Sequence, residues 1–284
     1  MNSKVAMVTG ATSGIGRVTA RELARRGYAV VLACRNPRLA EETSEEIRRE
    51  TGNDNIHILV GDFASLNQVR QLATRFGGLF NRLDILVNNA GYLPGPREIT
   101  PEGLEKSFCV NYLSHFLLTN LLHEFLMRSS SARIINLSSV LHRWAKIPWD
   151  DLQFLRSYGK YRAYSIAKLA NVMFTHELAK RLSKSQTPNI TVNAVHPGSV
   201  ASSFGSDSRA YKVIIIMLRP FLLTPEQGAE GLIYLATAAE VEGVSGKYFQ
   251  GKNQAQPSRY SLQDHSCQRL WEVSEKLTQL QQGF

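Results

Sequence analysis

Tyr164 and Lys168 stand four residues apart in the segment YRAYSIAK, which spans residues 161–168. On a helix this spacing puts both side chains on one face, with about 5–6 Å between their Cβ atoms. The unperturbed pKa of a phenol is about 10, and a nearby ammonium lowers it because it stabilises the phenolate. We therefore predict that Tyr164 exchanges a proton with a substrate. Tyr161 lacks a lysine four residues later and is expected to be structural or to line a pocket.

A second hydroxyl is needed to orient and polarise the oxygen atom of the substrate. The apolar run at 132–139 ends in Ser138-Ser139, and doubly wound sheets place their sites at the carboxyl ends of strands. Ser139 is our candidate for this donor. The alternative is that the two serines only cap a helix.

The elements that must position these groups are visible as six short apolar runs that alternate with segments of helical periodicity. The runs lie at 5–10, 29–34, 56–62, 83–91, 132–139 and 190–198. This alternation predicts an α/β fold with a doubly wound parallel sheet and helices on both faces. Two helices are expected to begin at Asn36-Pro37 and Ser65 and to end at Gly52 and Gly77.

The chain shows no linker and no internal repeat, so we expect a single domain over residues 1–284. Within that domain, a cofactor half is expected over about 1–130. The catalytic and substrate half is expected over about 131–284.

A glycine-rich turn, TGATSGIG at 9–16, follows the first apolar run. Glycines in such a turn let the backbone approach a pyrophosphate at the positive end of the next helix. The turn is therefore expected to bind a dinucleotide, although a glycine-rich turn can also be no more than a turn. The residues expected to contact the cofactor are Gly10, Thr12, Ser13, Gly14, Ile15 and Gly16.

Arg35 follows the second apolar run, 19 residues after Gly16, near the position where an acidic residue would hold the ribose hydroxyls of NAD. A guanidinium there suits a 2′-phosphate, so the sequence favours NADP, unless Arg35 is only a solvated strand-end residue. Asp62 ends the third run, and its carboxylate is expected to accept from the adenine amino group or to start a turn. Asn89, Ala90 and Gly91 end the fourth run, where small residues leave space for the adenosine ribose.

The composition limits the kinds of partner. The formal net charge is +9, which favours a phosphate-rich cofactor or an acidic membrane surface, and the scattered basic residues predict no nucleic acid partner. The three cysteines lie far apart, which indicates free thiols and no metal site. The first apolar run begins at residue 5, so neither a signal peptide nor an N-terminal anchor is expected. The segment 213–223 is too short to span a bilayer. We expect a cytoplasmic protein, with peripheral contact to a membrane left open.

Taken together, these segments resemble the short-chain dehydrogenase/reductase family. The matching motifs, in family order, are TGATSGIG (9–16), NNAG (88–91), the asparagine of CVNYLS (Asn111), Ser139, YSIAK (164–168) and PG (197–198). The resemblance covers nearly the whole chain and implies a Rossmann-type domain with Asn111, Ser139, Tyr164 and Lys168 as the catalytic set. It also implies that Asn111 holds a water molecule that links Lys168 to solvent. Further cofactor residues implied by the family are Phe63, Pro197, Gly198 and Val200.

Longer segments are similar to the retinol dehydrogenase-like branch of that family, namely LACRNP, LSSVLHRWAKIPWDDL, YSIAKLANVMFTHELAKRL and VHPGSV. That branch implies NADP(H) and a small lipophilic aldehyde, ketone or alcohol, and the family implies a homodimer or homotetramer. Ser202 stands where the family usually has a threonine on the cofactor carboxamide, and residues of about 200–225 are expected to form the substrate lid.

The leading hypothesis is an NADP(H)-dependent carbonyl reductase or alcohol dehydrogenase that transfers a hydride at C4 of the nicotinamide. One alternative is a catalytically silent NADP-binding protein with a regulatory or scaffolding role, although such a protein need not keep all four catalytic residues. Another is a lipid-binding protein that uses 211–223 at a membrane surface.

Overall fold

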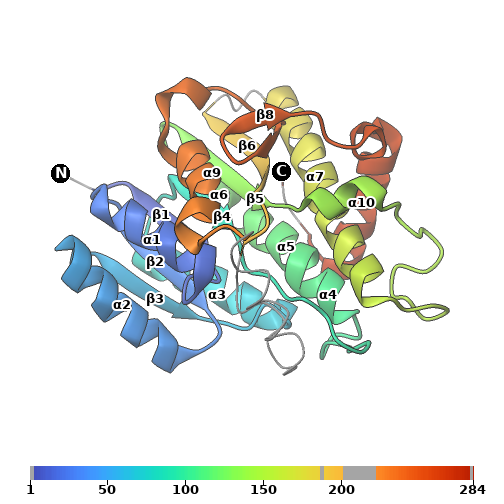
Figure 1. Cartoon of the computed structure of the whole chain (residues 1–284), viewed down its shortest axis with the longest axis horizontal. Coiled ribbons are helices and arrows are strands. Elements are labelled where there is room, and N and C mark those ends of the chain that lie inside the picture. The colour runs from blue at the N-terminus through green and yellow to red at the C-terminus, as the bar shows by residue number, and fades with distance from the viewer. Residues whose placement is uncertain (1–2, 186–188, 201–221, 282–283) are drawn as a thin grey trace.

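A computed structural model describes residues 3–185, 189–200, 222–281 and 284 of the protein. At its centre lies an eight-stranded sheet in the order β3-β2-β1-β4-β5-β6-β7-β8 (Figure 1). Successive neighbours from β3 to β7 pair in parallel, and β8 pairs with β7 in the antiparallel sense. The strands are β1 (Val5–Thr9), β2 (Ala29–Cys34), β3 (Ile56–Val60), β4 (Ile85–Asn88), β5 (Ala132–Leu137), β6 (Ile190–His196), β7 (Tyr248–Gln250) and β8 (Asn253–Ala255). The strand order reverses between β1 and β4, so the predicted doubly wound fold is confirmed.

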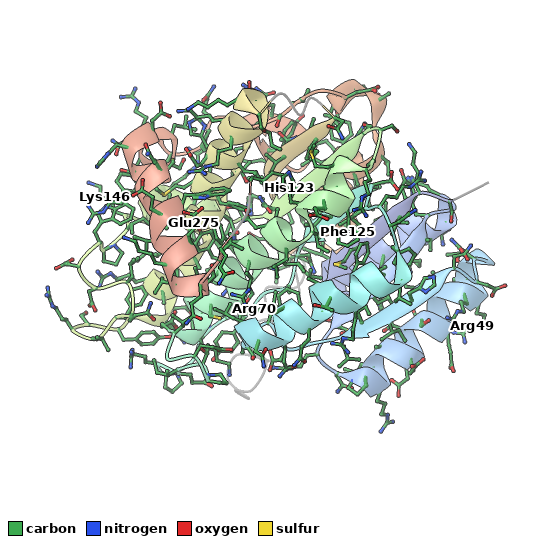
Figure 2. The ribbon with its side chains drawn as sticks, turned by 180° about the vertical axis from the view of Figure 1, so that it is seen from behind. Arg49, Arg70, His123, Phe125, Lys146 and Glu275 are labelled. Atoms are coloured by element: carbon green, nitrogen blue, oxygen red, sulfur yellow. The ribbon has the colours of Figure 1, made fainter. Side chains whose placement is uncertain are left out.

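Helices cover both faces of the sheet and bury a separate apolar core on each. One face carries α1 (Gly14–Arg25), α2 (Pro37–Thr51) and α9 (Pro225–Thr237), which are labelled in the left half of Figure 1. On the opposite face, seen in Figure 2, lie α3 (Leu66–Leu79), α5 (Ser114–Leu121), α7 (Lys160–Lys184) and α10 (Asp264–Thr278). Shorter helical segments are α4 (Lys106–Phe108), the π-turn η1 (Cys109–Leu113), α6 (His123–Met127), η2 (Val140–Trp144), η4 (Ala239–Val241) and η5 (Arg259–Leu262).

Side-chain caps define the ends of the two helices that were predicted most specifically. The Leu39 N–H donates to Oδ1 of Asn36 at 3.1 Å, and Gly52 closes α2 in the left-handed region with a φ of +69°. Ser65 caps α3 in the same way, but the prediction that α3 ends at Gly77 is wrong by two residues. Gly77 lies inside the helix because α6 packs closely there: a Cβ at that position would come 2.8 Å from a ring carbon of Phe125.

The helices α5 and α7 pack against other elements of the single chain. Residues 114–120 of α5 are all buried, and α10 packs along α7. A homodimer or homotetramer therefore stays a prediction. Among the described residues, no helix combines the length and apolar character that a bilayer crossing requires.

Candidate active site

The glycine-rich turn joins β1 to α1 by a path that only glycine follows without strain. Gly10 has a φ of +66° and Gly14 a φ of +52°. Gly16 lies so close to the turn that a Cβ there would come 2.3 Å from the Gly10 carbonyl oxygen. The turn is thus compact and presents backbone to its outer side.

The N-terminus of α1 differs from those of α2, α3 and α9. Asn36, Ser65 and Thr224 each accept a hydrogen bond from their helix through a side-chain oxygen, whereas Ser13 makes no such bond at the start of α1. The first N–H groups of α1 therefore lack a side-chain cap, and the helix dipole adds partial positive charge there. These are the groups that a dinucleotide pyrophosphate requires.

The NNAG segment is bonded directly to the base of this turn. Thr9 Oγ1 accepts hydrogen bonds from the N–H groups of Asn89 at 2.9 Å and Ala90 at 2.8 Å. The Asn89 side chain in turn donates to the Thr9 carbonyl at 2.8 Å. A Cβ on Gly10 would come 2.9 Å from the Ala90 Cα, so the two segments are in contact. Gly91 follows at the same edge, and the predicted ribose region is assembled beside the phosphate turn.

The two serines after β5 have different roles. Ser138 is buried, and its hydroxyl donates to the Lys168 carbonyl at 2.8 Å, so it ties β5 to α7. Ser139 caps η2, where its Oγ accepts from the Leu141 N–H at 3.3 Å. That bond uses an acceptor site and leaves the Ser139 hydrogen available. Ser139 therefore caps a helix and can also donate to a substrate oxygen.

The structure brings Tyr164 and Lys168 together on α7. The Lys168 ammonium lies 5.6 Å from the centre of the Tyr164 ring and donates to the Leu137 carbonyl at 2.9 Å. Lys168 is 1% exposed, and this burial lowers its pKa to about 7. Among the described residues no carboxylate pairs with it. Tyr161, in contrast, is 57% exposed in the first turn of α7, with the Lys160 ammonium 5.0 Å from its ring centre.

Asn111 lies in the π-turn η1, and its side-chain amide is hydrogen-bonded to neighbouring protein groups. Its Oδ1 accepts from the Tyr92 N–H at 3.0 Å, and its Nδ2 donates to the Tyr92 carbonyl at 2.8 Å and the Ser107 carbonyl at 2.9 Å. The side chain thus fastens η1 to the segment that follows NNAG. The expectation that Asn111 holds a water molecule stays a prediction.

Three predicted cofactor residues, which follow β2 and β3, differ in their contacts with the rest of the protein. They are Arg35, Asp62 and Phe63. Arg35 follows β2, is exposed, and makes no hydrogen bond or ion pair with any described residue. Asp62 accepts from the Ala64 N–H at 2.9 Å, so its alternative role as a turn residue is fulfilled, with one carboxylate oxygen still outside that bond. Phe63 is buried against the His115 ring, and its carbonyl accepts from Ser114 Oγ at 2.6 Å.

The PG segment follows β6 at the same edge of the sheet. Gly198 has a φ of +89°, and a Cβ there would come 2.4 Å from a methyl group of Leu223, so glycine is required. Val200 forms an isolated parallel bridge with Leu223, and a Cβ on Gly228 of α9 would come 2.5 Å from Val200. Thr12 lies in the glycine-rich turn and Ile15 in the first turn of α1. Ser202 and positions 201–221 of the expected lid lie outside the described residues.

Two buried histidines support the site and were not predicted. His142 accepts from the Ser258 N–H at 3.1 Å through Nε2, so its proton is on Nδ1, which donates to the Ser139 carbonyl at 2.7 Å. His115 spans Thr9 Oγ1 at 3.2 Å and the Asn111 carbonyl at 3.4 Å, and burial lowers its pKa to about 3. The one sequence signal for His115 is its position four residues after Asn111.

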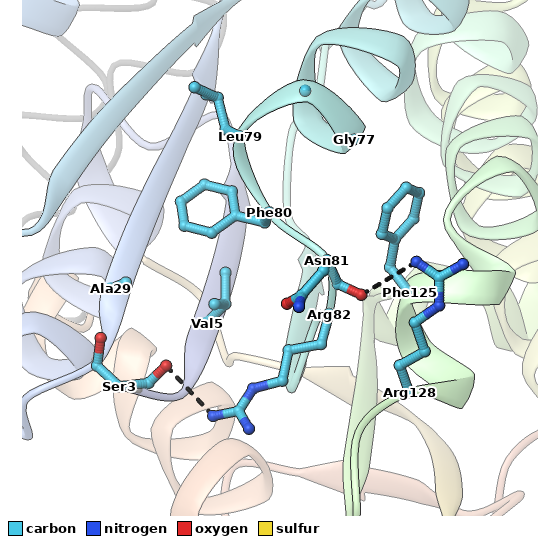
Figure 3. A pocket seen from close by; sticks show the side chains of 11 residues that line it. Ser3, Val5, Ala29, Gly77, Leu79, Phe80, Asn81, Arg82, Phe125 and Arg128 are labelled. Atoms are coloured by element: carbon cyan, nitrogen blue, oxygen red, sulfur yellow. Dashed lines mark hydrogen bonds between the residues drawn. The ribbon is translucent and has the colours of Figure 1, made fainter. Parts of the chain in front are cut away.

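A hollow of about 540 Å³ lies at the opposite edge of the sheet, beside the first residues of β1 and β2 (Figure 3). Its arginines are directed to backbone oxygens: Arg82 donates to Ser3 at 3.3 Å, and Arg128 donates to Asn81 at 3.3 Å. None of the predicted site residues lines it. The chemistry-bearing residues gather at the carboxyl edge instead.

Comparison with known proteins agrees with this arrangement. The profile of the short chain dehydrogenase family matches residues 4–212. Retinol dehydrogenase 12 of Mus musculus is 41% identical over 278 residues, which cover 98% of this chain and 87% of that protein. Retinol dehydrogenase 13 of Mus musculus is 42% identical, over 98% of this chain and 84% of that protein.

Solved structures show the same fold. An uncharacterised protein from Mycobacterium paratuberculosis superimposes with a TM-score of 0.78 at 31% identity, over 97% of this chain and 93% of that one. A short chain dehydrogenase from Pseudomonas syringae superimposes with a TM-score of 0.70 at 28% identity, over 87% of this chain and 94% of that one. The sequence motifs, the sheet order and these relatives agree, and the chain belongs to the short-chain dehydrogenase/reductase family of oxidoreductases, in its retinol dehydrogenase-like branch.

Proposed function

We propose that the protein is an NADP(H)-dependent oxidoreductase that reduces a lipophilic aldehyde or ketone to the alcohol, with Tyr164 as the acid. The observation that carries this proposal is the state of Lys168. An ammonium that is 1% exposed, bonded to a carbonyl and without a described carboxylate partner is unfavourable for folding. A chain keeps such a group where its charge or its proton is used.

The residues divide the chemistry as follows. NADPH, when bound, supplies the hydride that reduces the carbonyl carbon. Ser139 donates a hydrogen bond to the substrate oxygen and orients it, and Tyr164 gives its phenolic proton to the same oxygen. Lys168 stabilises the resulting phenolate through its positive charge, because its ammonium lies beside the Tyr164 ring. Asn111 contributes through η1, the turn that its side chain fastens.

The preference for NADPH over NADH is proposed from Arg35. Its guanidinium is exposed at the carboxyl end of β2, and no described residue competes for it. The anionic 2′-phosphate of NADPH would bind to this guanidinium, whereas the two ribose hydroxyls at the same place in NADH carry no charge to pair with it. The cofactor half of about 1–130 and the catalytic half of about 131–284 follow from the same assignment.

The lipophilic substrate class is proposed from the relatives. Proteins that are 41–42% identical over nearly all of this chain are named retinol dehydrogenases. Retinoids, steroid ketones and lipid aldehydes share an apolar body with a single carbonyl or hydroxyl, and the proposed function extends to that shared chemistry.

A substrate panel tests this proposal directly. Retinal, a steroid ketone, a medium-chain aliphatic aldehyde and a short polar aldehyde are each offered with NADPH and with NADH, and cofactor oxidation is followed by absorbance. We expect turnover of the apolar carbonyls with NADPH in preference to the polar aldehyde. Tight NADPH binding without turnover of any carbonyl would support the silent binding protein instead.

A further inference from the structure

Ser139 lies at the junction between β5 and η2, directly after a residue that is held on two sides. The Ser138 N–H donates to the Val195 carbonyl of β6 at 2.8 Å, and its hydroxyl donates to the Lys168 carbonyl of α7 at 2.8 Å. The Oγ of Ser139 accepts from the Leu141 N–H at 3.3 Å, which is a long hydrogen bond. A bond of this length fixes the hydroxyl weakly, so its direction depends on how the Ser139 backbone is held on the η2 side.

His142 holds the Ser139 backbone on that side. Its N–H donates to the Ser139 carbonyl at 3.1 Å, and its ring Nδ1 donates to the same oxygen at 2.7 Å. The first bond is the ordinary backbone bond of η2, and any residue at this position can make it. The second, shorter bond requires the imidazole.

The orientation of the His142 ring is determined by a partner from the other end of the chain. Nε2 accepts from the Ser258 N–H at 3.1 Å, 116 positions later in the sequence. The residue is 0% exposed, and the centre of its ring lies 4.8 Å from that of Tyr248. A flipped ring would place carbon atoms against both hydrogen-bond partners, so these two bonds determine the orientation and the neutral Nδ1–H tautomer. Burial also lowers the pKa of His142, which favours that neutral form.

The segment between β8 and η5 contacts η2 at two consecutive residues. Ser258 caps η5, which packs against α7. Arg143, the residue after His142, donates to the Gln256 carbonyl. Of these two contacts, the one through His142 continues to Ser139.

We propose that His142 is a positioning residue for Ser139, whose ring joins the Ser139 carbonyl to the Ser258 N–H and so fixes the direction in which the Ser139 hydroxyl donates. This inference rests on the proposed function, because the role of His142 is exerted through Ser139 in carbonyl reduction. The imidazole stays neutral throughout and transfers no proton. A displaced hydroxyl stabilises the substrate oxygen less well in the transition state, and small displacements of a catalytic group lower the rate strongly.

The first test needs neither cofactor nor substrate. ¹⁵N NMR of the full chain distinguishes imidazole nitrogens that carry a hydrogen from those that do not, and the chain has seven histidines. The signals of His142 are assigned by their loss in His142→Gln. We expect the Nδ1–H tautomer for His142 near neutral pH. The Nε2–H tautomer or a protonated ring would overturn the inference.

The second test compares two substitutions that each keep one end of the imidazole. The amide of asparagine can take the place of Nδ1, and that of glutamine the place of Nε2. His142→Asn therefore keeps a donor for the Ser139 carbonyl, whereas His142→Gln keeps only an acceptor for the Ser258 N–H. We expect kcat to fall by roughly tenfold or more in His142→Gln and several-fold less in His142→Asn, with the Kd for NADPH within about threefold in both. Equal kcat in the two variants, or the reverse order, would overturn the inference.

The third test breaks the link from its far end and leaves both His142 and Ser139 unchanged. Ser258 has a φ of −65°, which proline adopts, so Ser258→Pro removes the N–H at a compatible backbone position. Ser258→Ala is the matched control, because both variants lose the Oγ that caps η5 but only the proline loses the N–H. We expect kcat to fall by roughly threefold or more in Ser258→Pro relative to Ser258→Ala. The same kcat in the two variants would show that Ser258 does not act on Ser139.

The fourth test asks whether His142 acts through the Ser139 hydroxyl. In Ser139→Ala that hydroxyl is absent, so adding His142→Gln is expected to change kcat by less than about twofold. A merely structural role of His142 would give the same fold loss in both backgrounds, and that result would overturn the inference.

These tests separate the two proposals. If the unaltered protein reduces carbonyls and His142→Gln does so equally well, the inference fails and the proposed function stands. If NMR shows the Nδ1–H tautomer but no carbonyl is reduced, the proposed function fails, and the positioning role is overturned with it.

Discussion

The two edges of the sheet differ in how many partners a buried charged side chain has. At the amino edge, Asp84 is 3% exposed, and it accepts from the Val5 N–H at 2.7 Å and from Ser129 Oγ at 2.7 Å and pairs with Arg82 at 3.2 Å. At the carboxyl edge, Lys168 is 1% exposed and donates to a single carbonyl at 2.9 Å. The Asp84 carboxylate thus has two hydrogen-bond donors and a cationic partner, whereas the Lys168 ammonium has one described acceptor and no described carboxylate.

The same contrast holds for helix ends. Asn36 caps α2 with its own side chain, whereas α1 begins with an uncapped turn of glycines. Groups that the chain satisfies by itself stabilise the fold. The uncapped start of α1 and the Lys168 ammonium both lie at the carboxyl edge, which carries every described residue of the candidate site. The predictions below test this difference, from the largest expected effect on activity to the smallest.

Tyr164→Phe deletes only the phenolic hydroxyl at the carboxyl edge. We expect turnover to fall by roughly 10²–10⁴, the range typical of lost general acid–base catalysis, while NADPH still binds. Steady-state kinetics and fluorescence titration with NADPH measure the two quantities. Tyr161→Phe is the matched control, and its rate is expected to stay within a small factor because that side chain is largely exposed. The reverse result would remove the site assignment.

Lys168→Met tests the difference between the two edges of the sheet, because it should lower turnover and at the same time raise the free energy of unfolding. Turnover is expected to fall by about 10² or more, since the charge beside Tyr164 is lost. Burial lowers the pKa of Lys168 from 10.5 to about 7, so the unfolded chain binds this proton more tightly than the folded one. The resulting penalty is full below pH 7, fades as the pH rises from 7 to 10.5 and is absent above that.

Urea unfolding of the cofactor-free protein measures that penalty. At pH 6 the free energy of unfolding of Lys168→Met is expected to exceed that of the unaltered protein, by about 3 kcal/mol. At pH 9 the difference is expected to be smaller. A variant that is less stable at pH 6 would show that Lys168 is compensated after all.

Arg35→Asp tests whether the uncommitted cation at the carboxyl edge binds the cofactor. The unaltered protein is expected to bind NADPH more tightly than NADH, and the variant is expected to reverse that order, with a change of roughly 10–100-fold in the ratio of the two Kd values. Isothermal titration with each cofactor gives these values. Arg38→Asp, another exposed arginine nearby, is the control and is expected to leave the ratio unchanged.

Asp84→Asn tests the compensated edge, where the smallest effect on activity is expected. The variant loses a charge that Arg82 and the Val5 N–H both use, so the free energy of unfolding should fall by about 1–3 kcal/mol. The kcat for the best carbonyl substrate should stay within about twofold, because no site residue contacts Asp84. A large loss of kcat in a folded variant would break the distinction between the two edges.

Local features of the fold were predictable because they depend on neighbours in the sequence. Asn36 and Ser65 cap the helices that they were expected to start, and the apolar runs are the parallel strands. The end of α3 was misplaced because a glycine usually signals a stop. Gly77 instead makes room for Phe125, 48 positions later in the chain, and no local pattern shows such a contact.

The residues of the candidate site and their roles stay predictions, to which the structure adds their positions and hydrogen-bond partners. The sequence named Ser139 as the candidate donor, and the hydrogen bond from Ser138 to the Lys168 carbonyl adds that the other serine ties β5 to α7. It also offered no reason to single out His142 or His115, because their partners Ser258 and Thr9 lie far away in the sequence.

The sequence by itself determined the order of the strands and helices, the glycines of the phosphate turn and the four-residue spacing of Tyr164 and Lys168. Tertiary structure alone decided the state of Lys168. The spacing places the ammonium near the phenol on any helix, but the pKa falls to about 7 only because the sheet, η1 and α10 pack around α7 and exclude water. Desolvation depends on what surrounds a group in space, and a linear pattern does not contain that information.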